Sequence, residues 1–385
     1  MYSNNGERRV AIVHDWLPLY GGAERVLEQI IKVFPEADIF SLIDGLSPSD
    51  RHFLGGRTVH TSFLQRLPWG RTKYRHYFPL MPLAIEQFDL SSYDLIISSS
   101  YAFAKGVLTG PDQLHLCFCH SPVRYAWDMQ HQYLQEAGLS SGITSWIARI
   151  LLHSVRLWDT RTANGVDAFV TNSKFVARRI AKTYRREAEV IYPPVDLEAF
   201  PLCVQKEDFY LTVSRMVPYK RVGLIVQAFN QMPEKRLVVI GDGPEFARIS
   251  KIAGPNVQLL GFLPSASVRD YMQKAKAFIF AAEEDFGIVP VEALACGTPV
   301  IAYGRGGARE SLQDRVTGLF FDQQSPESVV DAVRRFEASS CSFDASAIRH
   351  RAEQFSPARF RREFQGFVER HWASFKKSLA VATED

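Results

Sequence analysis

The residues of this 385-residue chain with the clearest chemical content are two glutamates, Glu284 and Glu292, in the run E-D-F-G-I-V-P-V-E. Gly287 permits a close backbone approach, and Pro290 suits the first turn of a helix, where its missing N–H is not needed. The pattern predicts a helix over 290–296 that begins at the loop carrying Glu284. Its free N–H groups would favour hydroxyls and phosphate oxygens. Alternatively, Glu284 caps this helix and Glu292 is an ordinary solvated residue.

Two cations follow another apolar run. The segment F-Y-L-T-V-S-R-M-V-P-Y-K-R, from Phe209, predicts a strand that ends near Arg215, with Lys220 five residues later. Pro218 bends the chain between them, so both cations are expected at the carboxyl end of the strand. Such a pair suits a diphosphate, because it neutralises charge on a departing phosphate oxygen. The alternative is a solvated basic turn.

Glycine turns end two more predicted strands. The run G-D-G-P begins at Gly241, and Y-G-R-G-G-A-R-E begins at Tyr303. A single turn of this kind is weak evidence for a phosphate site. Several such loops at the carboxyl ends of strands, however, match the edge at which open α/β sheets bind ligands.

These motifs resemble a known family. The order Arg215-x4-Lys220, G-D-G-P and Glu284-x7-Glu292 is similar to the C-terminal half of family four retaining glycosyltransferases, which have the GT-B fold. The run H-D-W-L-P-L-Y-G-G-A-E-R-V resembles their glycine-rich loop and first helix, and C-H-S-P-V-R-Y-A-W-D resembles their histidine loop. The resemblance covers about residues 8–340. The sequences of the motifs R-Y-A-W-D and V-P-Y-K-R are most similar to those of bacterial O-antigen mannosyltransferases.

The resemblance implies an α/β protein of two Rossmann-like, doubly wound parallel-sheet domains facing a central cleft. It also implies transfer of a hexose, mannose from GDP-mannose, to a lipid-linked glycan in lipopolysaccharide O-antigen or exopolysaccharide synthesis, with retention at the anomeric carbon. The implied catalytic residues are Arg215, Lys220, Glu284 and His120, and the implied donor-binding residues are Gly22, Gly243, Phe286, Gly287, Ile288 and Glu292. Asp285 departs from the glycine that many relatives have there.

The domain organisation follows from two series of apolar runs, since strands buried on both faces of a parallel sheet read as continuous apolar segments. The proline-rich segment 192–201 separates the series. We expect an N-terminal domain over 1–193, a nucleotide-sugar domain over 194–355, a helix over 356–375 that packs back on the first domain, and a disordered tail over 376–385. The predicted strands are 10–13, 38–42, 95–98, 114–119, 168–171 and 190–192, then 210–213, 237–240, 257–260, 277–280, 299–302 and 319–321.

Composition sets limits on location and cofactors. The net charge is +3, with 46% hydrophobic and 23% charged residues, as in an ordinary globular protein. No apolar run is long enough to cross a bilayer, and charged residues interrupt any signal-peptide core, so we expect a cytoplasmic location, with peripheral attachment to the membrane left open. The five cysteines form no disulfide or zinc pattern, and no D-x-D element occurs. We therefore expect no metal and no cofactor, while the oligomeric state is not indicated.

One stretch, residues 51–85, contains six Arg or Lys residues and three histidines but no acid, with aromatic residues between them. Such a surface favours a lipid diphosphate or anionic headgroups. The modest net charge and the lack of an RNA-binding motif disfavour nucleic acid. The alternative is a basic loop with core aromatics. The apolar run 146–158 is a candidate for a second contact. The expected acceptor or membrane residues are Arg66, Trp69, Arg71, Lys73, Arg75, Arg124 and Asp128.

Two other functions remain compatible with the sequence. One is a nucleotide-sugar 2-epimerase of the same fold, which would produce an epimer from the donor without an acceptor. The other is a non-catalytic partner that binds a glycan or lipid. A lone histidine such as His120 is more often structural, but its position after a strand and its loop neighbours Arg124 and Asp128 favour a site.

Overall fold

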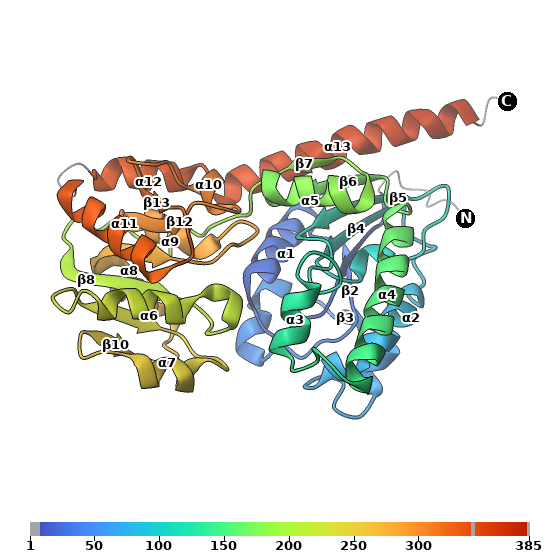
Figure 1. Cartoon of the computed structure of the whole chain (residues 1–385). Helices are drawn as coiled ribbons and strands as arrows, with labels where there is room; N and C mark the ends of the chain where they lie inside the picture. Colours follow the sequence, from blue (N-terminus) through green and yellow to red (C-terminus); the bar gives the residue numbers. More distant parts are fainter. Residues whose placement is uncertain (1–7, 340–342, 383–385) are drawn as a thin grey trace. The chain divides into compact units, whose positions relative to one another are not determined.

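The computed structural model describes residues 8–339 and 343–382, which form two compact units. Unit 1 comprises residues 1–192 and 360–385, and unit 2 comprises residues 193–359. Each unit is built on its own parallel sheet, and each is described by itself below (Figure 1). The fold is therefore α/β with two Rossmann-like domains, as expected.

The sheet of unit 1 has seven parallel strands in the order β3-β2-β1-β4-β5-β6-β7. Because successive side chains of a strand point to opposite faces, Ile12 and Ile97 enter one core, with α1 and α13, whereas Val13 and Ile96 enter another, with α2. The strands are β1 Val10–His14, β2 Asp38–Ser41, β3 Val59–Thr61, β4 Leu95–Ser100, β5 Leu114–Cys119, β6 Ala168–Thr171 and β7 Ala188–Val190.

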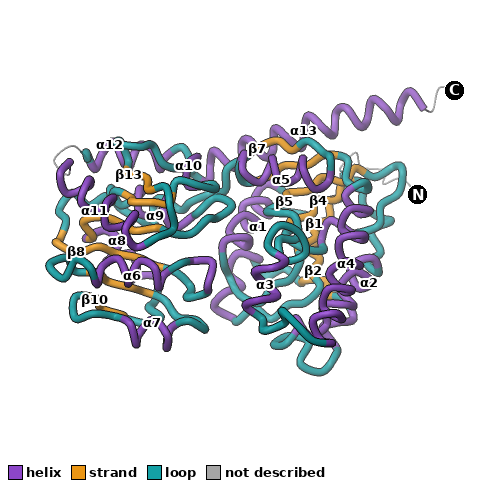
Figure 2. Tube along the Cα trace, in the orientation of Figure 1, coloured by secondary structure: helices purple, strands orange, loops and turns teal. Residues whose placement is uncertain are grey.

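The helices of unit 1 cover both faces of this sheet (Figure 2). The α-helices are α1 Gly22–Val33, α2 Met81–Glu86, α3 Gln130–Glu136, α4 Ile143–Ala163, α5 Lys174–Tyr184 and α13 Pro357–Ala382; the 3-10 helices are η1 Pro48–Leu54, η2 Phe63–Arg66, η3 Tyr74–Leu80 and η4 Ala104–Gly106. A buried ion pair between Lys105 and Asp159 of α4 attaches this helix to the rest of the unit. The Asp159 carboxylate also accepts hydrogen bonds from Tyr184 (2.9 Å) and Trp127 (2.7 Å).

The sheet of unit 2 has six parallel strands in the order β10-β9-β8-β11-β12-β13. One face packs against α6, α7 and α11 in a single apolar core, and α9 contacts β11 and β12. The strands are β8 Glu207–Val213, β9 Leu237–Ile240, β10 Val257–Leu259, β11 Ala275–Phe280, β12 Val300–Tyr303 and β13 Gly318–Phe321; the helices are η5 Pro218–Lys220, α6 Val222–Asn230, α7 Phe246–Ile252, α8 Ser265–Lys274, α9 Ile288–Ala295, α10 Ala308–Ser311, α11 Pro326–Ser339 and α12 Ala345–Glu353.

The C-terminal helix begins in unit 2 and continues into the core of unit 1. From Phe360 onward α13 belongs to unit 1, where Phe360, Phe364 and Phe367 are buried beside Phe34 and Phe118. The alternative of a helix confined to its own domain is therefore wrong. The predicted tail over 376–385 is also wrong as far as residue 382, because α13 runs to Ala382; residues 383–385 lie outside the described part. No Gly or Pro interrupts residues 373–382, so nothing local stops the helix.

Two other sequence predictions need correction. The edge strand β3 was missed, because three residues, V-H-T, carry no continuous apolar run. The helix predicted over 290–296 begins earlier, at Ile288, with Gly287 as its N-cap in a left-handed conformation (φ 85°). Pro290 still lies in the first turn of α9, where its ring fits. Within the described residues, no helix is both long and apolar enough to cross a membrane.

Candidate functional site

The candidate site in unit 2 lies at the carboxyl ends of β8, β9, β11 and β12. After β8, Ser214 N–H donates to Ile240 (3.0 Å), and Met216 N–H donates to Asp242 (2.8 Å). These bonds bring the β8 and β9 loops together so closely that a Cβ on Gly243 would lie 2.6 Å from the carbonyl oxygen of Met216. Glycine is therefore required at 243, where φ is 154°.

The cations predicted in the β8 loop differ in their surroundings. Lys220 ends the 3-10 helix η5 and forms an ion pair with the Oε1 of Glu284, with both side chains 18% exposed. Arg215 is exposed, and no residue in the described ranges forms an ion pair with it. The structure thus brings Lys220 and Glu284 together across 64 positions of sequence, a contact that sequence analysis did not predict.

The loop that carries Glu284 is fixed from its backbone side. Gly307 N–H donates to the carbonyl oxygen of Glu284 (2.8 Å). A Cβ on Gly307 would lie 2.3 Å from the Cα of Phe286, and one on Gly306 would lie 2.5 Å from the Glu284 carbonyl oxygen. The two glycines after β12 therefore hold the β11 loop by direct backbone packing, which leaves the carboxylate of Glu284 directed at Lys220.

The remaining residues of unit 2 that were predicted to bind the sugar donor lie at the start of α9. Gly287 is its N-cap and Ile288 its first residue, so the free N–H groups of the first turn lie next to the Glu284 loop. Phe286 is buried against Phe355, with ring centroids 5.3 Å apart, and anchors the loop. Glu292 lies one turn further along and is only 6% exposed, so the alternative of a solvated helix residue is wrong.

In unit 1, the polar residues gather at the carboxyl ends of β1, β4 and β5. Gly22 opens α1, directly after the loop that follows β1, and Glu24 accepts the N–H of Gly21 (2.9 Å) at the start of that helix. Fully buried Asp15 accepts four backbone N–H bonds, from residues 101–104, at 2.5 to 3.0 Å. Burial raises the pKa of Asp15, while His14 and these N–H groups act in the opposite direction.

His120 lies at the end of β5 and is 9% exposed. Its Nε2 is 2.9 Å from the hydroxyl of Ser99, and that hydroxyl is 3.1 Å from Nδ1 of His14. Burial, followed by the nearby His14, lowers the pKa of His120 to about 3. The residue is therefore a neutral imidazole near neutral pH, able to donate from one nitrogen and accept at the other.

Three further polar residues of this site, Asp15, Glu24 and Ser99, were not predicted from the sequence. Asp15 and Glu24 stand inside the glycine-rich motif, so their position was a usable signal. Ser99 was not recognisable, because the strand was predicted to end at Ser98 where the apolar run stops. Only the length of β4, set by its pairing with β1 and β5, places Ser99 between the two histidines.

The expected acceptor or membrane residues fall into two groups. Arg66, Arg71, Lys73, Arg75 and Trp69 are exposed around η2 and η3, and Lys73 Nζ lies 5.6 Å from the Trp69 ring centroid. The other two predicted positions, Arg124 and Asp128, belong to the histidine loop.

In that loop Asp128 is held by Arg179 (2.9 Å), which also donates to Ser121 (3.0 Å). Asp128 is therefore part of a contact that fixes the loop. Two further cations of the basic stretch over residues 51–85 have structural roles. Arg51 forms an ion pair with Asp44 (2.6 Å), and Arg57 donates hydrogen bonds to backbone carbonyl oxygens.

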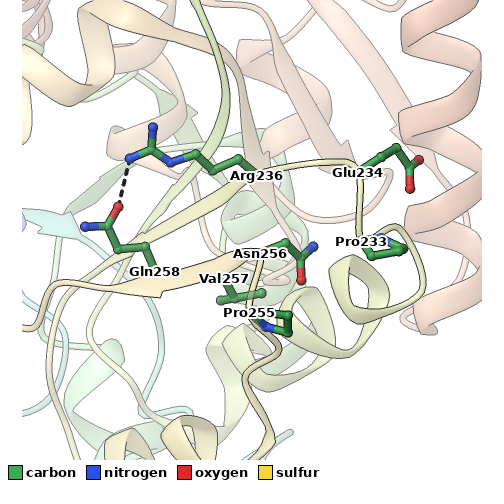
Figure 3. Close-up of a pocket in the computed structure, with 7 residues that line it drawn as sticks. All are labelled: Pro233, Glu234, Arg236, Pro255, Asn256, Val257 and Gln258. Atoms are coloured by element: carbon green, nitrogen blue, oxygen red, sulfur yellow. Dashed lines mark hydrogen bonds between the residues drawn. The ribbon is translucent and has the colours of Figure 1, made fainter.

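A separate hollow of about 530 Å³ lies in unit 2 where β9 and β10 begin, at the opposite end of these strands from the candidate site. Two of its lining residues are hydrogen-bonded, since Arg236 donates to the side-chain oxygen of Gln258 (2.9 Å; dashed line in Figure 3). None of its lining residues is a predicted site residue. In the described ranges no three His, Cys, Asp or Glu side chains are grouped to hold a metal ion.

Comparison with known proteins gives two matching family models. Residues 20–199 match Glycosyltransferase Family 4, and residues 196–355 match Glycosyl transferases group 1. The D-inositol 3-phosphate glycosyltransferase of Mycobacterium marinum is 26% identical over 310 residues, which cover 65% of this chain and 63% of the relative. An uncharacterized glycosyltransferase of Methanocaldococcus jannaschii is 28% identical over 174 residues, 43% of this chain and 48% of the relative. The matched regions thus span between about half and two thirds of the length of these curated relatives.

Solved structures share the fold over nearly the whole chain. Anabaena HepE in complex with UDP superimposes with a TM-score of 0.69 at 18% identity, over 94% of this chain and 99% of HepE. The sucrose-phosphate synthase of Thermosynechococcus elongatus gives a TM-score of 0.71 at 16% identity, over 95% of this chain and 100% of the synthase. These structural similarities show that this chain has the GT-B fold.

Proposed function

We propose that this chain, whose residues 20–199 and 196–355 match the models Glycosyltransferase Family 4 and Glycosyl transferases group 1, is a glycosyltransferase that transfers a hexose from a nucleotide diphosphate sugar to an acceptor hydroxyl. The observation that carries the proposal is the contact between Lys220 and Glu284 beside the first turn of α9. It joins a cation, a carboxylate and free backbone N–H groups at one edge of the sheet. Diphosphate and sugar hydroxyls are the groups that such a set binds.

In the proposed reaction, negative charge develops on the leaving diphosphate as the glycosidic bond breaks. Arg215, Lys220 and the N-terminus of α9 stabilise this charge, and preorganised donors of this kind supply a large part of catalysis. Lys220 exchanges some of its contact with Glu284 for phosphate oxygens, which leaves the carboxylate to accept hydrogen bonds from sugar hydroxyls. Glu292 holds the nucleotide ribose, and no metal or cofactor is required.

Four features of the proposal rest on the sequence resemblance. These are the assignment of Glu292 to the nucleotide ribose, the assignment of His120 to the donor sugar, retention at the anomeric carbon, and mannose from GDP-mannose as the donor. The structural neighbour HepE is found in complex with UDP and with UDP-glucose, which supports a nucleotide-sugar donor and makes UDP-glucose the necessary comparison. Asp285 is the position at which this chain departs from the motif.

The test combines a donor panel with paired variants. Purified protein is incubated with GDP-mannose, UDP-glucose and other nucleotide sugars, with and without a polyprenyl diphosphate-linked saccharide, and nucleotide release and sugar products are measured. We expect acceptor-dependent release, lowered about 100-fold or more by Lys220→Ala and by Glu284→Ala. Arg335→Ala removes an ion pair with Asp331 on α11 of the same unit and serves as the matched control.

One outcome would overturn this function, and another would overturn the roles given to Lys220 and Glu284. An epimer formed from the donor without acceptor would show the isomerase instead. Full transfer by both variants, with melting temperatures unchanged, would remove Lys220 and Glu284 from the catalytic site.

We further propose that the acceptor is lipid-linked and that unit 1 contacts the cytoplasmic face of an anionic membrane. The α4 helix carries Ile143, Trp146, Ile147 and Ile150 at the spacing of one helical face, and these residues are 80%, 70%, 54% and 61% exposed. The cations around η2 and η3 add positive charge in the same unit. An apolar face with nearby cations and no exposed acid over residues 143–158 is the chemistry of an interfacial helix.

Vesicle flotation tests this surface. We expect binding to vesicles rich in phosphatidylglycerol and weak binding to neutral phosphatidylcholine vesicles. Replacing Trp146 and Ile150 together by serine should weaken binding about tenfold or more, because two large apolar side chains are lost from the interface. Phe262→Ser, which removes a 78% exposed aromatic from unit 2, is the control. Equal binding to both lipids, or an equal effect of Phe262→Ser, would contradict the proposed surface.

A further inference from the structure

Four side chains of unit 1 form a continuous polar chain that ends at His120. Glu24 Oε1 lies 3.4 Å from Nε2 of His14, Nδ1 of His14 lies 3.1 Å from the hydroxyl of Ser99, and that hydroxyl lies 2.9 Å from Nε2 of His120. His14 and Ser99 are fully buried, and Glu24 is 5% exposed. The chain therefore joins the first turn of α1 to the ends of β1, β4 and β5.

For a given protonation state of Glu24 and His14, the types of these groups fix the direction of every bond. An ionised carboxylate only accepts, so His14 donates from Nε2 to Glu24. If His14 is neutral, its Nδ1 carries a lone pair, and the single proton of the Ser99 hydroxyl donates to it. Ser99 must then accept from His120, which carries its proton on Nε2 and has a lone pair on Nδ1. No described residue hydrogen-bonds to that Nδ1, so it is left to accept from a ligand hydroxyl.

Protonation of His14 reverses the two bonds at Ser99. An imidazolium donates from both nitrogens, so Ser99 now accepts from His14 and donates to Nε2 of His120. His120 then carries its proton on Nδ1 and becomes a donor to the ligand. Only one proton enters from solvent, on His14, and His120 stays neutral in both states, in agreement with its pKa of about 3.

We propose that Glu24, His14 and Ser99 are positioning residues that set the tautomer of His120, and thereby decide whether its Nδ1 accepts from or donates to a ligand hydroxyl. The charged and titratable groups that face His14 are Asp15, Glu24 and the ring of Tyr101, which also contacts His120. The identity of the ligand as a sugar rests on the proposed function. The coupling between the two histidines does not.

The strand β4 supplies an internal control one residue away. Ser98 points to the opposite face of the sheet, where its hydroxyl lies 2.8 Å from Nε2 of His115. His115 is also fully buried, and its Nδ1 lies 3.1 Å from the carbonyl oxygen of Gly165. This pair has the same chemistry as Ser99 and His120 and is likewise buried, but it lacks a contact with His14.

The experiment is a pH titration of the ¹⁵N-labelled full chain by long-range ¹H–¹⁵N correlation of the imidazoles, assigned with His14→Gln and His120→Gln variants. We expect neutral His120 to change from the Nε2–H to the Nδ1–H form at the pH where His14 becomes charged. Ser99→Ala should abolish this change while His14 still titrates. Ser98→Ala should leave it intact, and Ser99→Thr, which keeps the hydroxyl, should restore it.

A His120 tautomer that stays constant over the whole pH range in which the chain is folded would overturn the proposal, as would an equal change in Ser99→Ala. A second readout uses the reaction: Ser99→Ala should remove the pH dependence of kcat that Ser98→Ala retains. If no transfer is found with any donor, the proposed function fails but the NMR result on the free protein still decides the coupling.

Discussion

At the scale of the residue, burial controls the charge of some titratable groups, and ion pairs control the charge of others. His115 and His120 stand at opposite faces of one sheet and are both neutral in the fold, because burial lowers their pKa to about 4 and about 3. In contrast, Lys220 and Glu284 are partly exposed and paired. The first arrangement controls hydrogen-bond direction, and the second provides charge for a diphosphate.

The buried histidines make stability fall in mild acid. Their folded pKa values lie below the unfolded value of about 6.5, so the unfolded state binds more protons as pH falls from 6.5 towards 4. Each should lower the free energy of unfolding by up to about 1.4 kcal/mol per pH unit in that window, and none above pH 7. Urea unfolding of wild type and His115→Gln at pH 7, 6 and 5 measures this slope. We expect the variant to be less stable at pH 7 but to lose less stability at pH 5; parallel curves would contradict the assignment.

At the scale of the element, apolar runs were sufficient to predict nearly every central strand, because a strand buried on both faces is mostly apolar. The apolar runs failed to predict strands whose length is set by packing and not by composition. Ser99 and Ser100 extend β4 by pairing with neighbours, and β3 is held at the edge by β2 alone. The contact of Lys220 with Glu284 was equally out of reach, because it depends on how two loops pack after their strands are placed.

The C-terminal helix yields a prediction of its own. Phe364 on α13 is fully buried between Phe360 and Phe34, with ring centroids 5.8 Å and 6.5 Å away. Phe364→Ala should lower the stability of unit 1 by about 3–5 kcal/mol, because it removes a buried ring and leaves a cavity. The neighbouring exposed Gln365→Ala should change stability by less than about 0.5 kcal/mol. Chemical unfolding followed by tryptophan fluorescence compares the two, and similar losses would show that α13 does not contribute this core.

At the scale of the whole molecule, each unit has apolar cores of its own. The residues proposed to bind the nucleotide diphosphate, Arg215, Lys220 and Glu292, all belong to unit 2. The helix α13 is the element that continues from one unit into the other. Unfolding of such a chain need not be two-state, so ligand effects can be assigned to one unit.

We therefore expect calorimetry to resolve two thermal transitions that respond to different changes. Phe364→Ala should lower the transition of unit 1 and so identify it. GDP at 100 times its dissociation constant should stabilise only the other transition, by about 2.7 kcal/mol, which corresponds to about 5–11 °C for a unit of this size. Lys220→Ala should remove that increase and Arg335→Ala should keep it, while UDP in place of GDP compares the two nucleotides. An increase confined to the transition that Phe364→Ala lowers would place the nucleotide on unit 1 and contradict the assignment of Lys220 to the diphosphate.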